Sequence, residues 1–316
     1  MTRAFIFPGQ GSQAVGMGQA LSQSFAAARL VFEEVDDALN QKLSKLMFEG
    51  PESDLTLTEN AQPALMAVSM AALRVLETEG HWRLADKADF VAGHSLGEYS
   101  ALAAAGALAL PDAARLLKLR GQAMQKAVPV GEGAMAAMLG PELEQVQKIA
   151  KQAAEETKLV CDVANDNSPG QVVVSGAKAA VERAMAIATE QGVKRSILLP
   201  VSAPFHCALM RPAADAMEEA LANTRIKQPV VPVIANVTAQ PVSDPATIAK
   251  LLVTQVTGTV RWRESVLAMK SLGVSKALEL GAGKVLAGLV KRIDKEIEAL
   301  SVGAPSDLEA ALKALG

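Results

Sequence analysis

Short apolar runs followed by glycine mark the predicted strands of this chain, and longer periodic segments mark its helices. Residues 4–7 (AFIF) end at Pro8-Gly9, and residues 89–93 (DFVAG) lead into a helical segment that begins near Leu96. Short buried runs bounded by turn residues are typical of strands in a parallel sheet. Helical periodicity predominates between the two runs. We therefore expect strands alternating with helices, which is the pattern of an α/β fold.

A different order of elements fills the middle of the chain. The pattern reads strand, helix, strand, strand, helix, strand over residues 134–139, 142–156, 159–164, 171–175, 178–191 and 194–199. This β-α-β-β-α-β order is the ferredoxin-like arrangement. Strands are expected again at residues 230–236 and 276–280, with helices between and after them. The sequence therefore predicts a discontinuous large domain, residues 1–127 and 200–316, with residues 128–199 inserted as a second domain.

Composition and charge exclude several classes of function. The 316 residues carry 31 basic and 34 acidic side chains, so no general positive field gathers nucleic acid. The longest apolar run, residues 101–110, is about half of the roughly 20 residues that a membrane helix needs. Cys161 and Cys207 form no CxxC pair, and the apolar stretch before Pro8 is too short for a signal peptide. We expect a cytoplasmic protein without a nucleic-acid or membrane partner, and no spacing such as HExxH predicts a metal site.

The strongest local motif is Gly93-His94-Ser95-Leu96-Gly97, which matches the nucleophile elbow G-x-S-x-G. Glycine on both sides permits a sharp turn between a strand and a helix. The turn presents the Ser95 hydroxyl at a helix N-terminus, where the N–H of Leu96 becomes an oxyanion donor. The same letters occur by chance in ordinary turns, but the predicted strand before and helix after favour a nucleophile.

A serine nucleophile needs a base, and the chain has three histidines. His94 adjoins Ser95 on the turn, where neighbouring side chains diverge, so a structural role is expected for it. His81 lies in a polar stretch and is expected at the surface. His206 lies in a loop with two prolines where the chain re-enters the large domain, which makes it the predicted base. No acid between Ser95 and His206 is well placed, so we expect a backbone carbonyl to orient the imidazole.

Two glycine-rich segments allow other interpretations. Gly9 and Gly11 flank Gln10 after the first strand, so this backbone approaches a ligand closely and can supply a second oxyanion donor. With Ala14 the segment also fits a dinucleotide fingerprint, but residues 131–136 fit equally and the pattern is weak. A later GAGK segment lacks the leading Gly and the Ser or Thr of a phosphate loop, which indicates a structural turn.

Arg120 lies on a predicted helix between Leu119 and Gly121. These neighbours favour a half-buried guanidinium, which can hold a carboxylate through two parallel hydrogen bonds. Arg115 and Lys118 on the same helix are expected to form a solvated face.

Four motifs in register extend the interpretation beyond single residues. They are residues 7–13 (FPGQGSQ), 93–98 (GHSLGE), 167–173 (NSPGQVV) and 203–206 (APFH). Together they resemble the malonyl-CoA:acyl carrier protein transacylases of fatty acid synthesis, and the related acyltransferase domains of polyketide synthases share the pattern. The resemblance runs nearly end to end. It implies an α/β-hydrolase-like core with an inserted ferredoxin-like domain, in agreement with the predicted order of elements.

The resemblance also implies a role for each matching position. These are the nucleophile Ser95, its base His206, the oxyanion donors Gln10 and Leu96, the carboxylate-binding Arg120, and Gln255, whose backbone carbonyl orients the base. Asn167, Gln171 and Phe205 would line the cleft between the domains. The ring of Phe205 would leave little room for an α-methyl branch. Cys207 departs from the Ser common at this position and places a thiol near the site.

The implied reaction is a two-step exchange through a malonyl-serine ester. Malonyl-CoA is the donor, the phosphopantetheine thiol of acyl carrier protein is the acceptor, and no cofactor is expected. Lys194, Arg195, Lys291 and Arg292 are candidates for meeting an acidic carrier, although solvated faces explain them equally well. A monomer is the simplest expectation. A serine esterase or thioesterase, which gives the acyl group to water, and a carrier-binding module with a decayed site are the alternatives.

Overall fold

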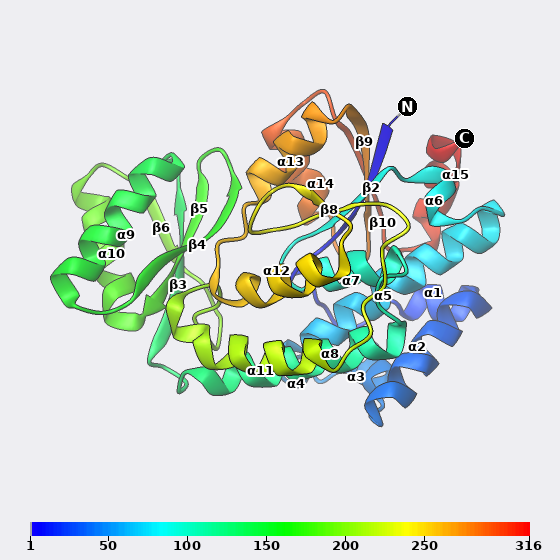
Figure 1. The fold of residues 1–316 in the computed structure, drawn as a ribbon, viewed down its shortest axis with the longest axis horizontal. Coiled ribbons are helices and arrows are strands. Elements are labelled where there is room, and N and C mark those ends of the chain that lie inside the picture. Colours follow the sequence, from blue (N-terminus) through cyan, green and yellow to red (C-terminus); the bar gives the residue numbers. More distant parts are fainter. Residues whose placement is uncertain (1) are drawn as a thin grey trace.

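Two β-sheets organise the chain, which the computed structural model describes over residues 2–316 (Figure 1). The larger sheet has six strands in the order β10-β9-β1-β2-β7-β8. Its strands are β1 (Thr2–Phe7), β2 (Phe90–Gly93), β7 (Val233–Ile234), β8 (Pro241–Val242), β9 (Val274–Leu280) and β10 (Glu298–Val302). Neighbours pair in parallel, except that β7 and β8 are antiparallel.

Helices cover both faces of this sheet. They are α1 (Gln19–Ser24), α2 (Ala26–Leu39), α3 (Leu43–Glu49), α4 (Glu52–Thr56), α5 (Thr58–Gly80), α6 (Leu84–Lys87), α7 (Gly97–Ala104), α8 (Leu110–Ala127), α11 (Arg211–Ala222), α12 (Pro245–Thr257), α13 (Trp262–Ser271), α14 (Val285–Ile293) and α15 (Leu308–Leu315), with short 3-10 helices η1 (Ala208–Met210) and η2 (Pro305–Asp307). Alternate residues of β1 face opposite layers. Phe5 and Phe7 pack in the core formed with α5 and α8, whereas Ala4 and Ile6 pack against α13 and α14. All four are fully buried, as a central parallel strand between two helical layers requires.

The smaller sheet has four antiparallel strands in the order β4-β5-β3-β6. They are β3 (Gly133–Leu139), β4 (Cys161–Ser168), β5 (Gln171–Ala177) and β6 (Arg195–Leu198). Helices α9 (Leu143–Thr157) and α10 (Lys178–Glu190) share a core with this sheet and lie at the left of Figure 1. The predicted β-α-β-β-α-β order and the α/β fold class are therefore confirmed. The domain limits at residues 128 and 199 stay predictions.

Strand β4 also joins the smaller sheet to the segment between α12 and α13. Backbone hydrogen bonds run from Asp166 N to the Val260 oxygen (3.0 Å) and from Val260 N to the Ala164 oxygen (2.9 Å). The Arg263 guanidinium donates to the buried carboxylate of Asp166 at 2.9 Å. Peptide hydrogen bonds and a charge-assisted pair together hold the smaller sheet against the larger one at this seam.

The larger sheet differs from the sequence prediction at its edges. The pattern predicts neither β8 nor β10, and β7 covers only Val233–Ile234 of the expected strand. A two-residue strand has no periodicity to detect. The sequence of β10, EALSV, does not alternate regularly between apolar and polar residues, and the strand is only partly buried. Edge strands are therefore the least visible part of this fold.

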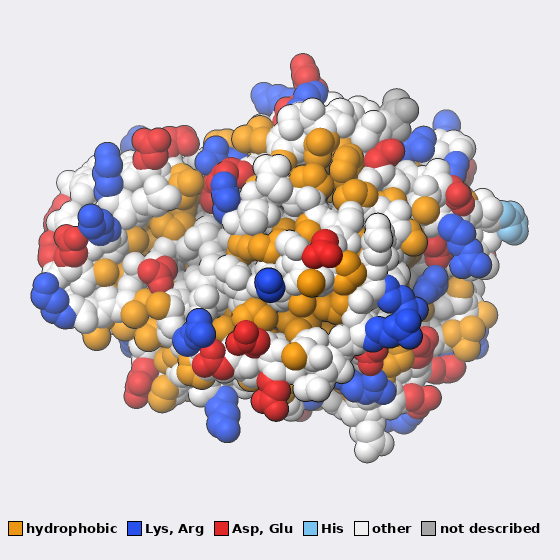
Figure 2. Space-filling view, in the orientation of Figure 1, with side chains coloured by type: hydrophobic (Ala, Val, Ile, Leu, Met, Phe, Trp, Pro, Cys, Tyr) orange, Lys and Arg blue, Asp and Glu red, His pale blue; other side chains and the backbone are white. Residues whose placement is uncertain are grey.

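The surface carries charges of both signs. Figure 2 shows Lys and Arg interspersed with Asp and Glu over the face of Figure 1, with hydrophobic side chains exposed between them. This distribution agrees with the net charge of -3. Among residues 2–316, no helix is long and apolar enough to cross a membrane.

Candidate active site

Ser95 lies on a sharp turn between β2 and α7, with a positive φ of 54°. Such a conformation is strained for a residue with a side chain and is common at functional sites. The glycines on either side are required by space. A Cβ on Gly93 would overlap the backbone of Gly97, and a Cβ on Gly97 would overlap the carbonyl oxygen of Phe7 in β1. The motif is therefore a packing requirement of the elbow that exposes the Ser95 hydroxyl.

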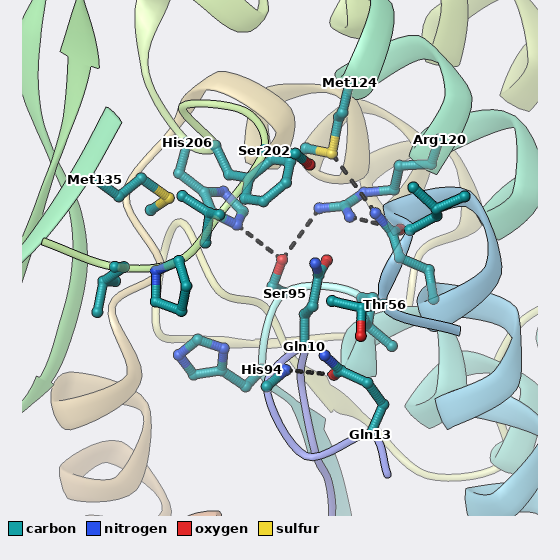
Figure 3. A pocket seen from close by; sticks show the side chains of 18 of the residues that line it. Gln10, Gln13, Thr56, His94, Ser95, Arg120, Met124, Met135, Ser202 and His206 are labelled. Carbon is teal, nitrogen blue, oxygen red and sulfur yellow. Dashed lines mark hydrogen bonds between the residues drawn. The ribbon is translucent and has the colours of Figure 1, made fainter. Parts of the chain in front are cut away.

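The Ser95 hydroxyl lies 2.7 Å from Nε2 of His206 (Figure 3). Nδ1 of the same ring lies 2.8 Å from the backbone oxygen of Gln255 in α12. A carbonyl only accepts hydrogen bonds, so Nδ1 carries the proton and Nε2 accepts from Ser95. Burial and the nearby Arg120 charge lower the pKa of His206 to about 3. The imidazole is therefore neutral at physiological pH and able to take a proton.

Arg120 extends from α8 toward the Ser95 hydroxyl (Figure 3). Its Nη2 lies 3.2 Å from Ser95 Oγ and 3.0 Å from Gln255 Oε1, and its Nη1 donates to Gln62 Oε1 at 2.8 Å. Its guanidinium carbon lies 5.8 Å from the ring centroid of Tyr99. The side chain is 1% exposed, and among residues 2–316 it forms no ion pair within 4.0 Å. A buried cation held only by neutral oxygens favours a carboxylate ligand.

A buried polar network supports the elbow. Asn236 accepts from the Ser95 N–H at 2.7 Å and donates to the Gly93 oxygen at 2.6 Å. The Glu98 carboxyl accepts from Asn236 N at 3.0 Å and from Gln255 Nε2 at 2.8 Å. Burial raises the pKa of Glu98 to about 7. This network fixes the amide of Gln255 with its nitrogen toward Glu98, so its oxygen faces the guanidinium.

Sequence reasoning missed Gln62, Glu98 and Asn236. A signal for Glu98 existed, because an acid directly after the elbow stands in the first turn of a helix that is otherwise apolar. No local pattern singles out Gln62 or Asn236, which reach the site only through the tertiary fold.

Ser95, Arg120 and His206 open onto one cavity of about 650 Å³. Further lining residues come from both sheets and their helices, and include Gln10, Leu96, Met124, Met135 and Phe205. The backbone N–H groups of Gln10 and Leu96 have no acceptor within the part of the chain that the structure describes. Both are therefore free to donate to a ligand oxygen in the cavity. The predicted lining position of Phe205 agrees with the structure.

Asn167 and Gln171 do not line this cavity, and their place in the cleft between the domains stays a prediction. Asn167 Oδ1 accepts from His94 Nε2 at 2.8 Å, and Gln171 Oε1 accepts from Arg292 Nη1 at 2.7 Å. Each bond joins the smaller sheet to the larger domain, at the turn after β2 and at α14, but neither side chain lines the cavity; Asn165 and His94 do. Asn167 and Gln171 instead form hydrogen bonds with the larger domain, and a sequence motif alone does not predict these contacts.

His81 and Cys207, the other residues considered from the sequence, lie where they take no part in the site. His81 is exposed at the end of α5, as expected. The Cys207 thiol is buried and donates to the Pro204 oxygen at 3.1 Å, and burial raises its pKa to about 11. It is therefore a packed thiol rather than a thiolate nucleophile. Within residues 2–316, no group of three or more His, Cys, Asp or Glu side chains is arranged to hold a metal ion.

The site combines a strained serine at a strand-to-helix elbow, a neutral histidine paired with it, and two free backbone N–H donors. This combination is typical of enzymes that transfer acyl groups through serine. The comparison with known families agrees. The model of the acyl transferase domain matches residues 4–300, so the chain belongs to the acyl transferase family.

Relatives and solved structures extend the likeness over the whole chain. A malonyl CoA-acyl carrier protein transacylase of Bacillus subtilis is 46% identical over 99% of this chain and 96% of its own length. The crystal structure of an acyl-carrier-protein S-malonyltransferase from Bartonella henselae superposes with a TM-score of 0.97 at 57% identity and covers 100% of both chains. A structure described as a type II PKS acyl-carrier protein in complex with its malonyl-transacylase has a TM-score of 0.95 at 41% identity, over 99% of this chain and 100% of that one.

Proposed function

We propose that this enzyme moves the malonyl group from malonyl-CoA to the phosphopantetheine thiol of acyl carrier protein. One observation carries the proposal beyond the family: the Arg120 guanidinium, which has no carboxylate partner among residues 2–316, is buried 3.2 Å from the Ser95 hydroxyl. Malonyl thioesters carry a carboxylate close to the reacting carbonyl, which is what this cation lacks. The names of the relatives support the same donor and acceptor.

In the first half-reaction Ser95 Oγ attacks the thioester carbonyl while its proton passes to Nε2 of His206. The N–H groups of Gln10 and Leu96 stabilise the oxyanion that forms. The C–S bond then breaks, and the CoA sulfur leaves as a thiol with the proton from His206. Arg120 binds the malonyl carboxylate, which orients the acyl group and selects a dicarboxylic half-thioester.

In the second half-reaction the carrier thiol attacks the malonyl-Ser95 ester. His206 takes the thiol proton and returns it to Ser95 Oγ as the C–O bond breaks. The product is the malonyl thioester of the carrier protein, and no redox step or external cofactor is needed. The polyketide carrier seen bound to one structural relative supports a carrier protein as the partner.

The remaining expectations belong to this proposal. We infer that the protein works in the cytoplasm, since both cysteines are buried and unpaired. A monomer is the simplest assembly that this reaction requires. The roles given above to Gln10, Ser95, Leu96, Arg120, His206 and Gln255 are those that the family resemblance implies.

Intact-mass analysis after incubation with malonyl-CoA tests the proposal. We expect one malonyl adduct on the wild type and none on Ser95→Ala, with discharge onto carrier protein that bears its phosphopantetheine arm. An adduct that discharges only to water would favour the esterase or thioesterase alternative. Absence of any adduct on a folded wild type would favour a decayed site.

A further inference from the structure

The loop of residues 199–206 runs from β6 to η1 and supplies much of the cavity wall. It carries both Phe205 and His206. Four of its other residues, Leu199, Pro200, Val201 and Ser202, also line the cavity. The position of this loop therefore sets the shape of the space beside Ser95.

Contacts with two elements, the smaller sheet and α12, fix the ends of the loop. Its first residue, Leu199, donates to the Met135 oxygen of β3 at 2.8 Å, and the Pro204 ring packs so closely on Gly133 that a Cβ there would overlap it. Its last residue, His206, is held on α12 by the carbonyl of Gln255. The ends are thus bound to the smaller sheet and to α12.

A third attachment holds the middle of the loop against α8. The Ser202 hydroxyl donates to Gln125 Oε1, and Gln125 Nε2 donates in return to the Ser202 backbone oxygen at 3.3 Å. Within residues 2–316 these are the side-chain hydrogen bonds that join the loop to α8. Because the amide of Gln125 uses both its ends on one residue, the pair is a reciprocal clamp with one geometry.

The clamp connects the two halves of the substrate site. Arg120 and Met124 lie one turn apart on α8 and both line the cavity. Gln125 follows Arg120 by five residues, which is about 7.5 Å along a helix axis. A rigid helix that carries the guanidinium is thereby tied to the loop that carries Phe205. The distance available between the bound carboxylate and the aromatic wall depends on this tie.

We propose that Gln125 and Ser202 are specificity-determining residues, which clamp the Phe205 loop to α8 and thereby exclude acyl groups with a substituent on the carbon between the thioester and the carboxylate. Gln125 lies outside the cavity lining and acts as a positioning residue, and Ser202, which lines the cavity, acts through its hydrogen bonds to Gln125. The inference rests on the proposed malonyl transfer. Cutting the clamp frees the middle of the loop while its ends, the base and Arg120 stay in place.

The test is single-turnover acylation of Ser95 followed by intact mass, with malonyl-, methylmalonyl- and acetyl-CoA. The variants are Gln125→Ala, Ser202→Ala and the double substitution. Gln122→Ala is the matched control, because Gln122 lies on the same helix but bonds the exposed Glu59. We expect the methylmalonyl-to-malonyl rate ratio to rise about tenfold in each clamp variant, as for the loss of a hydrogen-bonded pair.

Three further results are expected. The double variant equals the single ones, because the two residues act as a unit. The malonyl-to-acetyl ratio stays at the wild-type value, since Arg120 is untouched. Gln125→Glu, which keeps the acceptor for the Ser202 hydroxyl and loses the return donor, gives an intermediate methylmalonyl ratio.

An unchanged methylmalonyl ratio in the folded variants, or equal changes in both ratios, would overturn the clamp. That outcome leaves malonyl transfer intact, because the wild type would still acquire its malonyl adduct. A wild type that acquires none contradicts the proposed function instead. The two failures are therefore distinguishable in one data set.

Discussion

Gln255 contacts His206 through its backbone and Arg120 through its side chain. Its carbonyl oxygen lies 2.8 Å from Nδ1 of His206, and its Oε1 lies 3.0 Å from Nη2 of Arg120. One residue of α12 thus orients both the candidate base and the candidate carboxylate-binding cation. The use of a carbonyl in place of a carboxylate adds no negative charge beside Arg120, so the guanidinium stays available to the substrate.

The pH dependence of acylation follows from the environment of His206. Burial and the Arg120 charge lower the pKa of His206 to about 3, so the base is neutral at and well below neutral pH. We expect kcat/KM for malonyl transfer to show no acid limb near 6.5, the ordinary histidine value. In Arg120→Ala the removed positive charge lets the pKa rise, so the acid limb of acetyl transfer moves upward. The pH profiles of both proteins check this; an acid limb at 6.5 in the wild type would contradict it.

Arg120 should decide between acyl groups. Replacement by Ala removes a charged partner from the carboxylate, which costs about 3 kcal/mol or roughly a hundredfold in kcat/KM for malonyl-CoA. Acetyl-CoA has no carboxylate, so its transfer should be kept or improved. Steady-state assays with both donors measure the ratio. A variant that still prefers malonyl-CoA as the wild type does would remove Arg120 from the site.

Glu98 should make the free energy of unfolding depend on pH. Its pKa is about 7 in the folded protein against 4.5 in the free side chain, because burial disfavours the ionised form. The cost of ionisation is absent below pH 4.5, grows as the pH rises to about 7, and is constant above. Glu98→Gln removes it, so the stability difference between variant and wild type should shift by about 3 kcal/mol in favour of Gln from pH 4.5 to pH 8.

Urea unfolding of both proteins across this range measures the difference. The protonation of His206 affects both proteins alike and cancels. A difference that is flat with pH, or that favours Glu as the pH rises, would contradict a raised pKa at this position.

The elbow glycine Gly97 should tolerate no side chain. A Cβ there overlaps the Phe7 oxygen in β1, so Gly97→Ala must displace either the strand or the nucleophile turn. We expect a loss of several kcal/mol of stability or the loss of Ser95 acylation. Gly288→Ala is the control, because Gly288 lies in α14 with open space around it and alanine favours a helix by about 1 kcal/mol. Thermal unfolding and intact-mass analysis of Ser95 acylation compare Gly97→Ala with Gly288→Ala. Equal stability and equal acylation in the two variants would contradict the steric argument.

Local patterns were sufficient to predict the central strands and the elbow. The strand at residues 4–7 and the turn at Ser95 depend on neighbours in sequence, which is why periodicity and a five-residue motif detect them. Elimination among three histidines then led to His206, which does lie within hydrogen-bond distance of Ser95.

Contacts made by distant segments were not predictable in this way. Asn236 bonds the elbow across 141 positions of sequence, and no pattern around it differs from an ordinary loop. The motif around Asn167 does not predict which side chain reaches the cavity, because Asn167 bonds His94 whereas Asn165 lines the cavity. Charge state and burial, which define the candidate roles of Glu98 and Arg120, exist only in the folded protein.

The four-stranded sheet stands between Ser95 and His206 in chain order. A ribosome therefore makes the serine first, then the whole of residues 133–198, and only afterwards the histidine and the carbonyl of Gln255 that orients it. A nascent chain that ends at β6 has a hydroxyl without a base. The Ser95–His206 pair can therefore form only after the inserted sheet and α12 have both been made.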